Sequence, residues 1–199
     1  MHISRLPRSC GAVCLSLGIG LFTSSNVSAS DFSYGFLELS PQHWELDDNG
    51  SKLRQAGLGA ALSIEISDTS YLRFDGGFFD TDQYVLTQYR TGFGVHQSIT
   101  SRIDTFQEVG AMISRAEVTG ASGNTTDFLI ALGLRMKPVN LIELEAKVGF
   151  AGPDPDYKVG IRFLGEKELE GASLGFGYSV WKNENIDVDI ASMDFRFNF

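Results

Sequence analysis

Apolar and polar residues alternate along most of the chain beyond residue 55. In the stretch 55–67, apolar side chains take every even position from Ala56 to Ile66, while glycine and polar residues take most of the odd positions. Successive side chains of a β-strand point to opposite faces, so this period of two predicts amphipathic strands rather than helices. The same period recurs in 71–78, 128–137, 142–150, 157–163, 172–180 and 192–199.

Three stretches alternate less regularly, and single residues orient them. Around residue 35, the orientation of lower free energy places Glu38 on the polar face and Leu37 and Leu39 on the apolar face. Phe93 marks the apolar face of the next such stretch, and Glu108 marks the polar face of the third. Connections at one end are expected at 67–70, 99–104, 137–140 and 164–170, and those at the other at 46–52, 80–84, 119–126, 152–156 and 181–185. The count predicts about ten strands, or eight as the alternative, in up-and-down order with both chain ends on one side.

The first 29 residues have a different character. Two arginines precede an apolar stretch at 11–22, and the small residues of 27–29 follow it. This order predicts a secretory signal peptide over 1–29 and a single domain over 30–199.

Both cysteines of the chain lie within that leader, at Cys10 and Cys14. We therefore expect an exported domain without thiols, disulfides or a cysteine metal site. Cys14 lies at the start of the apolar stretch, whereas a lipoprotein signal places its cysteine after it.

Charge excludes further classes of protein. The formal charge is −9, and removal of the leader, with its two arginines and no acids, makes it −11. Such a chain is a poor partner for nucleic acid or for a polybasic lipid contact. No later stretch reaches the ~18 to 20 apolar residues of a transmembrane helix.

The polar strand face decides which solvent the apolar face meets. That face carries many glycines together with charges of both signs, as at Gly57, Gly59, Gly133 and Gly149. Glycine gains nothing on an exposed strand but relieves crowding inside a narrow cylinder. The apolar rows, at ~3.3 Å per residue, match the ~25 Å apolar band of an outer membrane, where closure removes unpaired edges. A closed antiparallel transmembrane barrel is therefore favoured over a soluble barrel of the lipocalin kind.

The ending DFRFNF and glycine-bearing strands such as RTGFGV, DFLIALGLR and SLGFGYS resemble the small OmpA/OmpX-like outer-membrane β-barrels of Gram-negative bacteria. The resemblance covers about 32–199 and implies that Phe195, Phe197 and Phe199 form the signal read by the barrel-assembly machinery. It also implies contact with outer-membrane lipid and lipopolysaccharide. The chain departs from OmpA in lacking a peptidoglycan-binding domain, and from OmpX in its short outer loops, which argues against an adhesin role.

The alternation predicts an interior that holds acids and bases in nearly equal number. Charges buried in a narrow space must pair, so we expect a network of salt bridges that fills the lumen. A thin pore usually carries an excess of one sign. Besides Glu38 and Lys137, the predicted network comprises Glu65, Arg73, Asp75, Arg90, Glu108, Arg135, Glu143, Glu145, Lys147, Lys158, Arg162, Asp194 and Arg196.

The outer end is expected to be acidic and ringed by aromatic residues. The predicted aromatic girdle is Trp44, Tyr84, Tyr89, Tyr157 and Trp181, at the level where such rings meet lipid headgroups. Acids of the outer loops include the pairs at 80 and 82, 154 and 156, and 187 and 189; each pair can bind a divalent cation or remain solvated. His43, close to Asp80 or Asp82, is the one candidate for a hydrolase at this rim.

Together these features predict a non-enzymatic integral outer-membrane barrel with a structural or envelope-interaction role. A narrow channel for ions or small solutes is the alternative, and a rim hydrolase centred on His43 is a remote one. We expect a monomer without cofactor, metal site or nucleic-acid partner.

Overall fold

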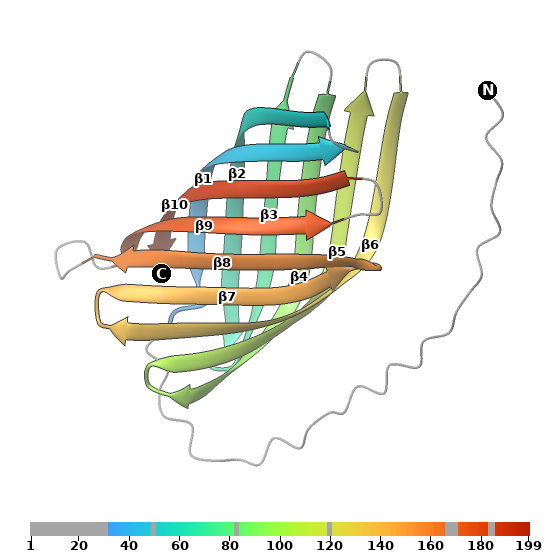
Figure 1. Ribbon diagram of the computed structural model, residues 1–199. Coiled ribbons are helices and arrows are strands. Elements are labelled where there is room, and N and C mark those ends of the chain that lie inside the picture. Colours follow the sequence, from blue (N-terminus) through green and yellow to red (C-terminus); the bar gives the residue numbers. More distant parts are fainter. Residues whose placement is uncertain (1–31, 49–50, 82–83, 119–120, 166–170, 183–185) are drawn as a thin grey trace.

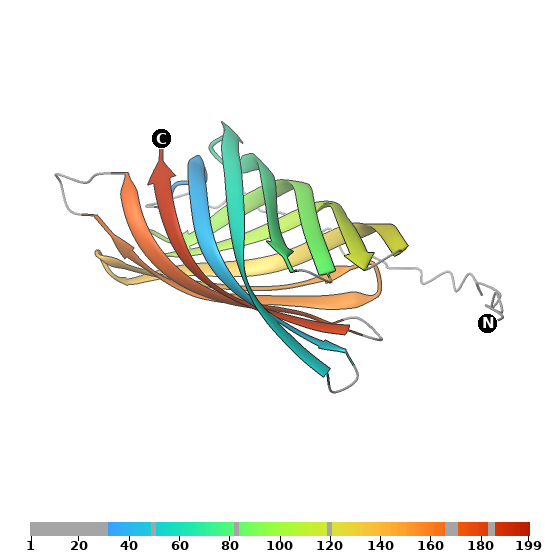
Figure 2. The same ribbon diagram turned by 90° about the horizontal axis from the view of Figure 1, so that it is seen from above.

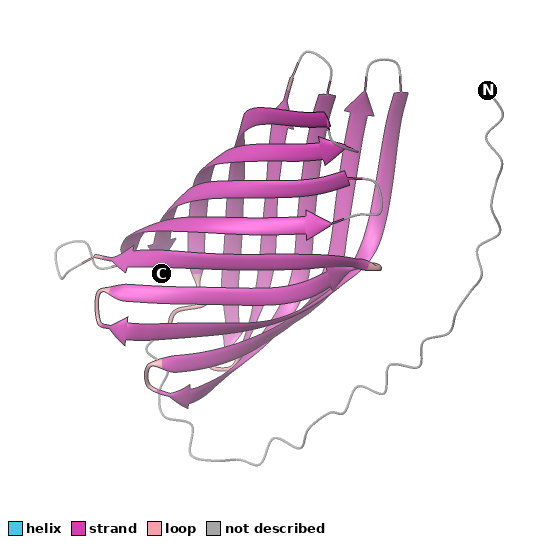
Figure 3. Ribbon diagram, in the orientation of Figure 1, coloured by secondary structure: helices cyan, strands magenta, loops and turns pink. Residues whose placement is uncertain are grey.

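The computed structural model describes residues 32–48, 51–81, 84–118, 121–165, 171–182 and 186–199. These residues form ten strands and, in the described ranges, no helix (Figures 1 and 3). The strands are β1 (Phe36–Asp48), β2 (Ser51–Ser67), β3 (Ser70–Asp80), β4 (Tyr84–Thr100), β5 (Ile103–Val118), β6 (Ala121–Val139), β7 (Ile142–Ala151), β8 (Asp154–Leu164), β9 (Ala172–Lys182) and β10 (Ile186–Asn198). The predicted signal peptide lies outside the described residues.

The ten strands form one closed antiparallel up-and-down barrel. Each strand pairs with its neighbours in sequence, and β1 closes the ring by pairing with β10, as in Phe36 opposite Asn198. The strands are long, twisted and strongly inclined to one another, which is clearest from above (Figure 2). The prediction of a closed barrel of about ten strands is confirmed, and the eight-strand alternative is wrong.

Apolar side chains cover the outside of the barrel over most of its height. Leu37 and Leu39 are 44% and 48% exposed, whereas Glu38 between them is 4% exposed. The same outward apolar row appears on the other strands, for example at Leu58, Phe74, Phe93, Val109, Leu132, Val148, Val159, Phe176 and Phe195. The predicted orientation of the two strand faces is therefore correct at this level of the barrel.

Near the end that carries the 49–50, 82–83 and 119–120 connections, the two faces exchange character. Outward positions become polar, as at Lys52 and Arg54, while inward positions become apolar. Phe79, for example, is fully buried. We call this level the outer segment and the rest of the barrel, which carries the outward apolar rows, the inner segment. An apolar interior under a polar exterior is the arrangement of a water-soluble barrel.

The strands also end at different heights in the outer segment. β2, β4, β5 and β6 have 16 to 19 residues, whereas β7, β8 and β9 have 10 or 11. The hairpins β3–β4 and β5–β6 accordingly rise to the top of the view in Figure 1. The β7–β8 turn stays low and passes through Gly152, whose φ of 62° suits glycine.

Candidate functional site

The interior of the barrel is the place where the predicted functional residues meet. It is filled at three levels: an aromatic cluster at the inner mouth, a layer of charges above it, and an apolar cluster in the outer segment. Every level draws side chains from several strands. The arrangement decides what the barrel is able to do.

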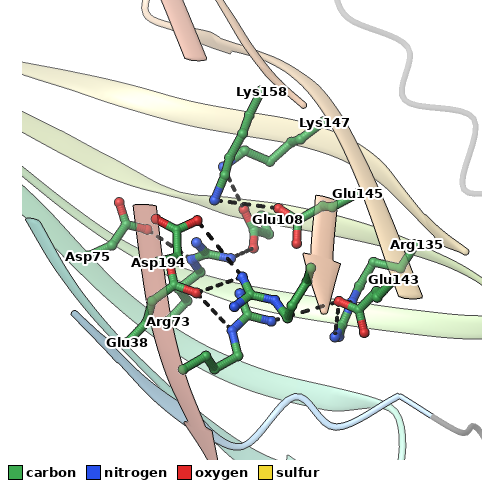
Figure 4. A network of polar contacts seen from close by, with 12 residues as sticks. Glu38, Arg73, Asp75, Glu108, Arg135, Glu143, Glu145, Lys147, Lys158 and Asp194 are labelled. Atoms are coloured by element: carbon green, nitrogen blue, oxygen red, sulfur yellow. Dashed lines mark hydrogen bonds and ion pairs between the residues drawn. The ribbon is translucent and has the colours of Figure 1, made fainter. Parts of the chain in front are cut away.

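The charge layer is built around Glu38 of β1. One carboxylate oxygen of Glu38 accepts hydrogen bonds from Arg162 Nη2 and from Arg196 Nε, each at 2.8 Å. All three side chains are at least nine-tenths buried. The shared carboxylate ties the first strand of the chain to β8 and β10 (Figure 4).

Neighbouring acids and bases continue the layer in pairs. Arg135 donates from Nε and Nη2 to one oxygen of Glu143, at 3.1 and 2.8 Å. Arg73 Nε donates to Asp75 at 2.9 Å, and its Nη1 lies 3.7 Å from Glu108. Further pairs join Lys147 to Glu108, Lys158 to Glu145 and Arg162 to Asp194 (Figure 4). The charges of the layer thus compensate one another, as buried charges must.

The structure brings together thirteen of the fifteen charges predicted for the network and adds two that the sequence interpretation missed. Lys137 lies instead at the inner mouth, with its Nζ 4.7 Å from the ring centroid of Phe32. Arg90 pairs with Asp156 through two hydrogen bonds of 2.9 and 3.3 Å, although Asp156 was expected in an outer loop. Asp104, expected in an inner connection, is fully buried. The alternation contained the signal: Tyr157 faces outward, so Asp156 beside it must face inward.

Glu65 is the other exception. It is exposed at the inner mouth rather than buried in the charge layer. Its Oε1 accepts hydrogen bonds from the backbone N–H groups of Tyr34 and Gly35, at 2.5 and 3.0 Å. Glu65 therefore holds the segment that precedes β1, and its assignment to the lumen network was wrong.

That segment, Phe32–Gly35, folds into the inner mouth. The ring of Tyr34 stacks on His96 with 3.9 Å between ring centroids and on Tyr71 with 4.7 Å. Its hydroxyl donates to Asp104 Oδ2 at 3.1 Å, the same oxygen that lies 3.2 Å from His96 Nδ1. We call this group the inner plug; the alternation did not predict it, because Phe32–Gly35 lies outside any strand.

Arg135 makes further contacts that hold the inner plug in place. The guanidinium of Arg135 lies over the rings of Phe32 and Tyr34, at 5.0 and 4.7 Å from their centroids, and donates to the Ser33 carbonyl at 2.9 Å. Glycines on the wall give the rings their room. A Cβ at Gly94 would lie 2.2 Å from the ring of Tyr71, and one at Gly133 would lie 2.0 Å from that of Phe106. Glycine was expected to relieve crowding inside the barrel, and at these two positions it does so by making room for aromatic rings.

An apolar cluster fills the interior of the outer segment. Trp44, Phe79, Leu86 and Val188 form one part of it, and Met112, Leu129 and Ala151 form another; Trp181 packs against both. Trp44 is only 1% exposed, and its indole N–H donates to Gln42 at 2.8 Å. The assignment of Trp44 and Trp181 to an outer girdle was wrong, because both positions continue the inward face of their strands.

The remaining girdle positions differ. Tyr89 and Tyr157 are 59% and 46% exposed on the outside of the barrel, where the girdle role stays a prediction. The side chain of Tyr84 lies outside the described residues.

The rim contains acids but, among the described residues, no group of three side chains able to hold a metal ion. Of the three acid pairs, Asp156 is engaged with Arg90 inside the barrel, and Asp82 lies outside the described residues. His43 is exposed on the outside of β1, between Gln42 and Trp44, which face inward. No hydrogen bond or ion pair joins it to Asp80 in the described part of the chain.

Two of the cavities in the described part of the barrel bear on conduction. One of about 90 Å³ lies between the charge layer and Trp44, and is lined by Gln42, Gln88 and Arg90 among others. The other, of about 460 Å³, lies at the inner mouth beside Arg135, Arg162 and Phe199. Neither cavity spans the interior.

The chain matches no protein-family model. It matches no curated protein either. It is similar in fold to several solved structures. Neisserial surface protein A shares 10% identity over 82% of this chain and 96% of its own, with a TM-score of 0.43.

Two further structures show similar values. Ail, the attachment invasion locus protein of Yersinia pestis, was solved with the heparin analogue sucrose octasulfate and shares 12% identity over 82% of this chain and 97% of its own, with a TM-score of 0.41. The KdgM porin, in complex with disordered oligogalacturonate, shares 7% identity over 81% and 99%, with a TM-score of 0.46. These values transfer no site, ligand or role to this chain.

The architecture itself is clear. A closed up-and-down barrel, outward apolar rows and an interior of paired charges match the general architecture of a transmembrane β-barrel. The described residues include no helix long and apolar enough to cross a membrane.

Proposed function

We propose that this chain is an integral outer-membrane protein with a structural or envelope-interaction role, exported through its leader and closed to solutes. The observation that carries the proposal is the combination of a lipid-matched exterior with an interior filled at three levels. The outward rows end in exposed aromatic residues, including Phe197 and Phe199, at 53% and 73%. Only lipid makes such an exterior favourable around a closed barrel.

A narrow channel is the second candidate, and these two cavities favour it. Conduction requires ions to pass the charge layer, the inner plug and the apolar cluster. An apolar constriction opposes conduction by excluding water. We therefore place the closed barrel first.

Planar-bilayer recording separates the two candidates. We expect purified, folded protein to insert without conductance steps. Reproducible steps from the wild-type barrel would establish the channel and remove the closed-barrel proposal. A variant that lacks Phe32–Gly35 tests the inner plug, and we expect it to stay closed because the other two levels remain.

The predicted partners are outer-membrane lipid, lipopolysaccharide and, during insertion, the barrel-assembly machinery. Phe195, Phe197 and Phe199 face outward at the end of β10, where a binding protein reaches them before closure. Deletion of Phe199 should reduce the amount of heat-modifiable barrel in the outer membrane. A Phe199→Trp variant keeps a terminal aromatic ring and should assemble normally. Equal assembly of the deletion and wild type would contradict this role.

We further propose a non-enzymatic role. The hydrolase alternative requires His43 to work with an acid at the rim, and no contact of His43 with Asp80 supports it. His96 is committed to stacking and to Asp104 inside the plug. A hydrolytic activity lost in His43→Ala would overturn this part of the proposal.

A further inference from the structure

β6 extends beyond the strand that should cover its far side. It pairs with β5 over most of its length, from Val118 opposite Ala121 to Ile103 opposite Met136. Its pairing with β7 begins only at Leu129, opposite Ala151. Residues 121–127 therefore form a sheet edge in the outer segment (Figure 1, yellow-green strands at the upper right).

The ladder identifies which backbone groups point out of this edge. Phe128 uses its carbonyl on the β7 side, where it accepts the N–H of Gly152 at 2.7 Å. Backbone groups of an antiparallel strand alternate between its two neighbours. The N–H and C=O groups of Ser122, Asn124 and Thr126 thus point out of the sheet, and those of the odd residues bond to β5.

This edge lacks the devices that usually protect an open strand. Natural edges carry lysine, proline or a bulge that discourages pairing. Residues 121–126 are small or polar and uncharged, and Ser122, Asn124 and Thr126 are exposed. The edge of β2 at 51–56, which β3 does not reach, differs because Lys52 and Arg54 flank it and bind Glu45 at 2.5 and 2.6 Å.

A second copy of this chain does not fit the edge. Two barrels in one membrane share the same outer side, so a twofold axis along the membrane normal relates them. Strands tilted by ~35 to 45° then cross at roughly twice that angle where they meet, which prevents a ladder. The fitting occupant is a segment that is free to align with β6.

Local charge limits the chemistry of that segment. The described bases of the outer segment each have an acid partner: Lys52 and Arg54 bind Glu45, Arg115 binds Glu117, and Lys182 lies 3.4 Å from Asp187. Asp127, at the base of the edge, and Asp80 add negative charge beyond these pairs. A segment with basic side chains complements this surface.

We propose that residues 122–126 of β6 form a docking edge that takes an extended, lysine- or arginine-bearing segment of an external protein as an added strand. Main-chain hydrogen bonds to the three even residues supply the register, and Asp127 selects for positive charge. The proposal deepens the envelope-interaction role, because the proposed membrane placement puts this edge outside the cell.

The test uses full-length folded protein in detergent micelles and the fluorescein-labelled peptide Lys-Thr-Val-Thr-Val-Thr-Lys. We expect saturable binding by fluorescence anisotropy and slower amide hydrogen exchange at 122, 124 and 126 than in free protein. A peptide N-methylated at alternate residues should bind at least tenfold more weakly, because it lacks the ladder donors. Asp127→Asn should weaken binding of the parent peptide several-fold.

A matched pair of variants isolates the edge. Asn124→Pro removes an N–H that points away from β5 and has no partner among the described residues, so the barrel should fold while peptide affinity falls at least tenfold. Asn124→Ser keeps that N–H and should bind like wild type. No binding by wild type, equal affinity of the N-methylated peptide, or equal affinity of the two variants would overturn the docking edge. None of these results affects the membrane placement, which is tested by fractionation and bilayer recording.

Discussion

The inner and outer segments of this barrel are made from the same strands, yet they use opposite faces for apolar side chains. Phe78 and Phe79 show the difference within two residues: Phe78 faces outward and is 48% exposed, whereas Phe79 faces inward and is fully buried. Lipid makes apolar exteriors favourable, and water makes them unfavourable. Under the proposed membrane placement, the level at which the faces exchange character marks the upper border of the membrane.

The two segments also fill their interiors with different kinds of side chain. The inner segment has an apolar outside and an interior filled with charges, which must compensate one another. The outer segment has a polar outside, and its interior packs aromatic and aliphatic side chains like an ordinary core. This contrast yields three mutational tests.

The largest effect should come from the charge layer. Arg73→Leu removes the partner of Asp75 and a neighbour of Glu108, and breaking a buried pair costs about 3 to 5 kcal/mol. Urea unfolding of the barrel in lipid vesicles measures the loss. Arg54→Leu removes an exposed ion pair at the rim and should leave the unfolding midpoint unchanged. Equal midpoints for Arg73→Leu and wild type would mean that water reaches the charge layer freely.

A somewhat smaller loss is expected in the apolar cluster. Phe79→Ala should destabilise the barrel at the lower end of the ~3 to 5 kcal/mol seen for buried phenylalanine, since the cluster lies near the outer opening. Phe78→Ala changes the same side chain on the lipid-facing side and leaves no internal cavity. The same unfolding assay should rank Phe79→Ala as the more damaging change. The reverse ranking would contradict an ordered core in the outer segment.

The smallest of the three effects tests the membrane border directly. Leu132→Arg places a charge in the outward apolar row and should cost about 2 to 4 kcal/mol, as arginine does at the midplane of such barrels. Thr126→Arg, six residues earlier on the same face of β6, should cost only about 0 to 1 kcal/mol in the aqueous zone. Similar losses for both variants would move the border beyond residue 126.

Much of the fold could be predicted from the chain because alternation is a local property. Strand count, order and the inward position of Glu38, Arg135 and Arg196 all follow from the period of two and the turn signals. The errors came from ending strands too early. Asp156 and Trp181 were assigned to loops, although the alternation of β8 and β9 continues through both positions.

Trp44 shows a second limit. Trp44 follows Glu38, Ser40 and Gln42 at alternate positions, so the alternation already predicted that its side chain points inward. It was nevertheless assigned to the girdle, because tryptophan is typical of such girdles. The inner plug was not predicted, because alternation does not reveal that Phe32–Gly35, which precedes β1, folds into the inner mouth. Its contacts with Glu65, His96 and Arg135 join segments that are distant in sequence.

The seam between β1 and β10 has a consequence for the order of assembly. Glu38 lies on the first strand, and its two closest bases, Arg162 and Arg196, arrive 124 and 158 residues later. A nascent chain must therefore keep this carboxylate hydrated until the final hairpin is in place, since no earlier base is bonded to it. Contacts between such remote positions form slowly. Ring closure and the pairing of Glu38 with these two arginines therefore form a single late event, which requires the last strand of the chain.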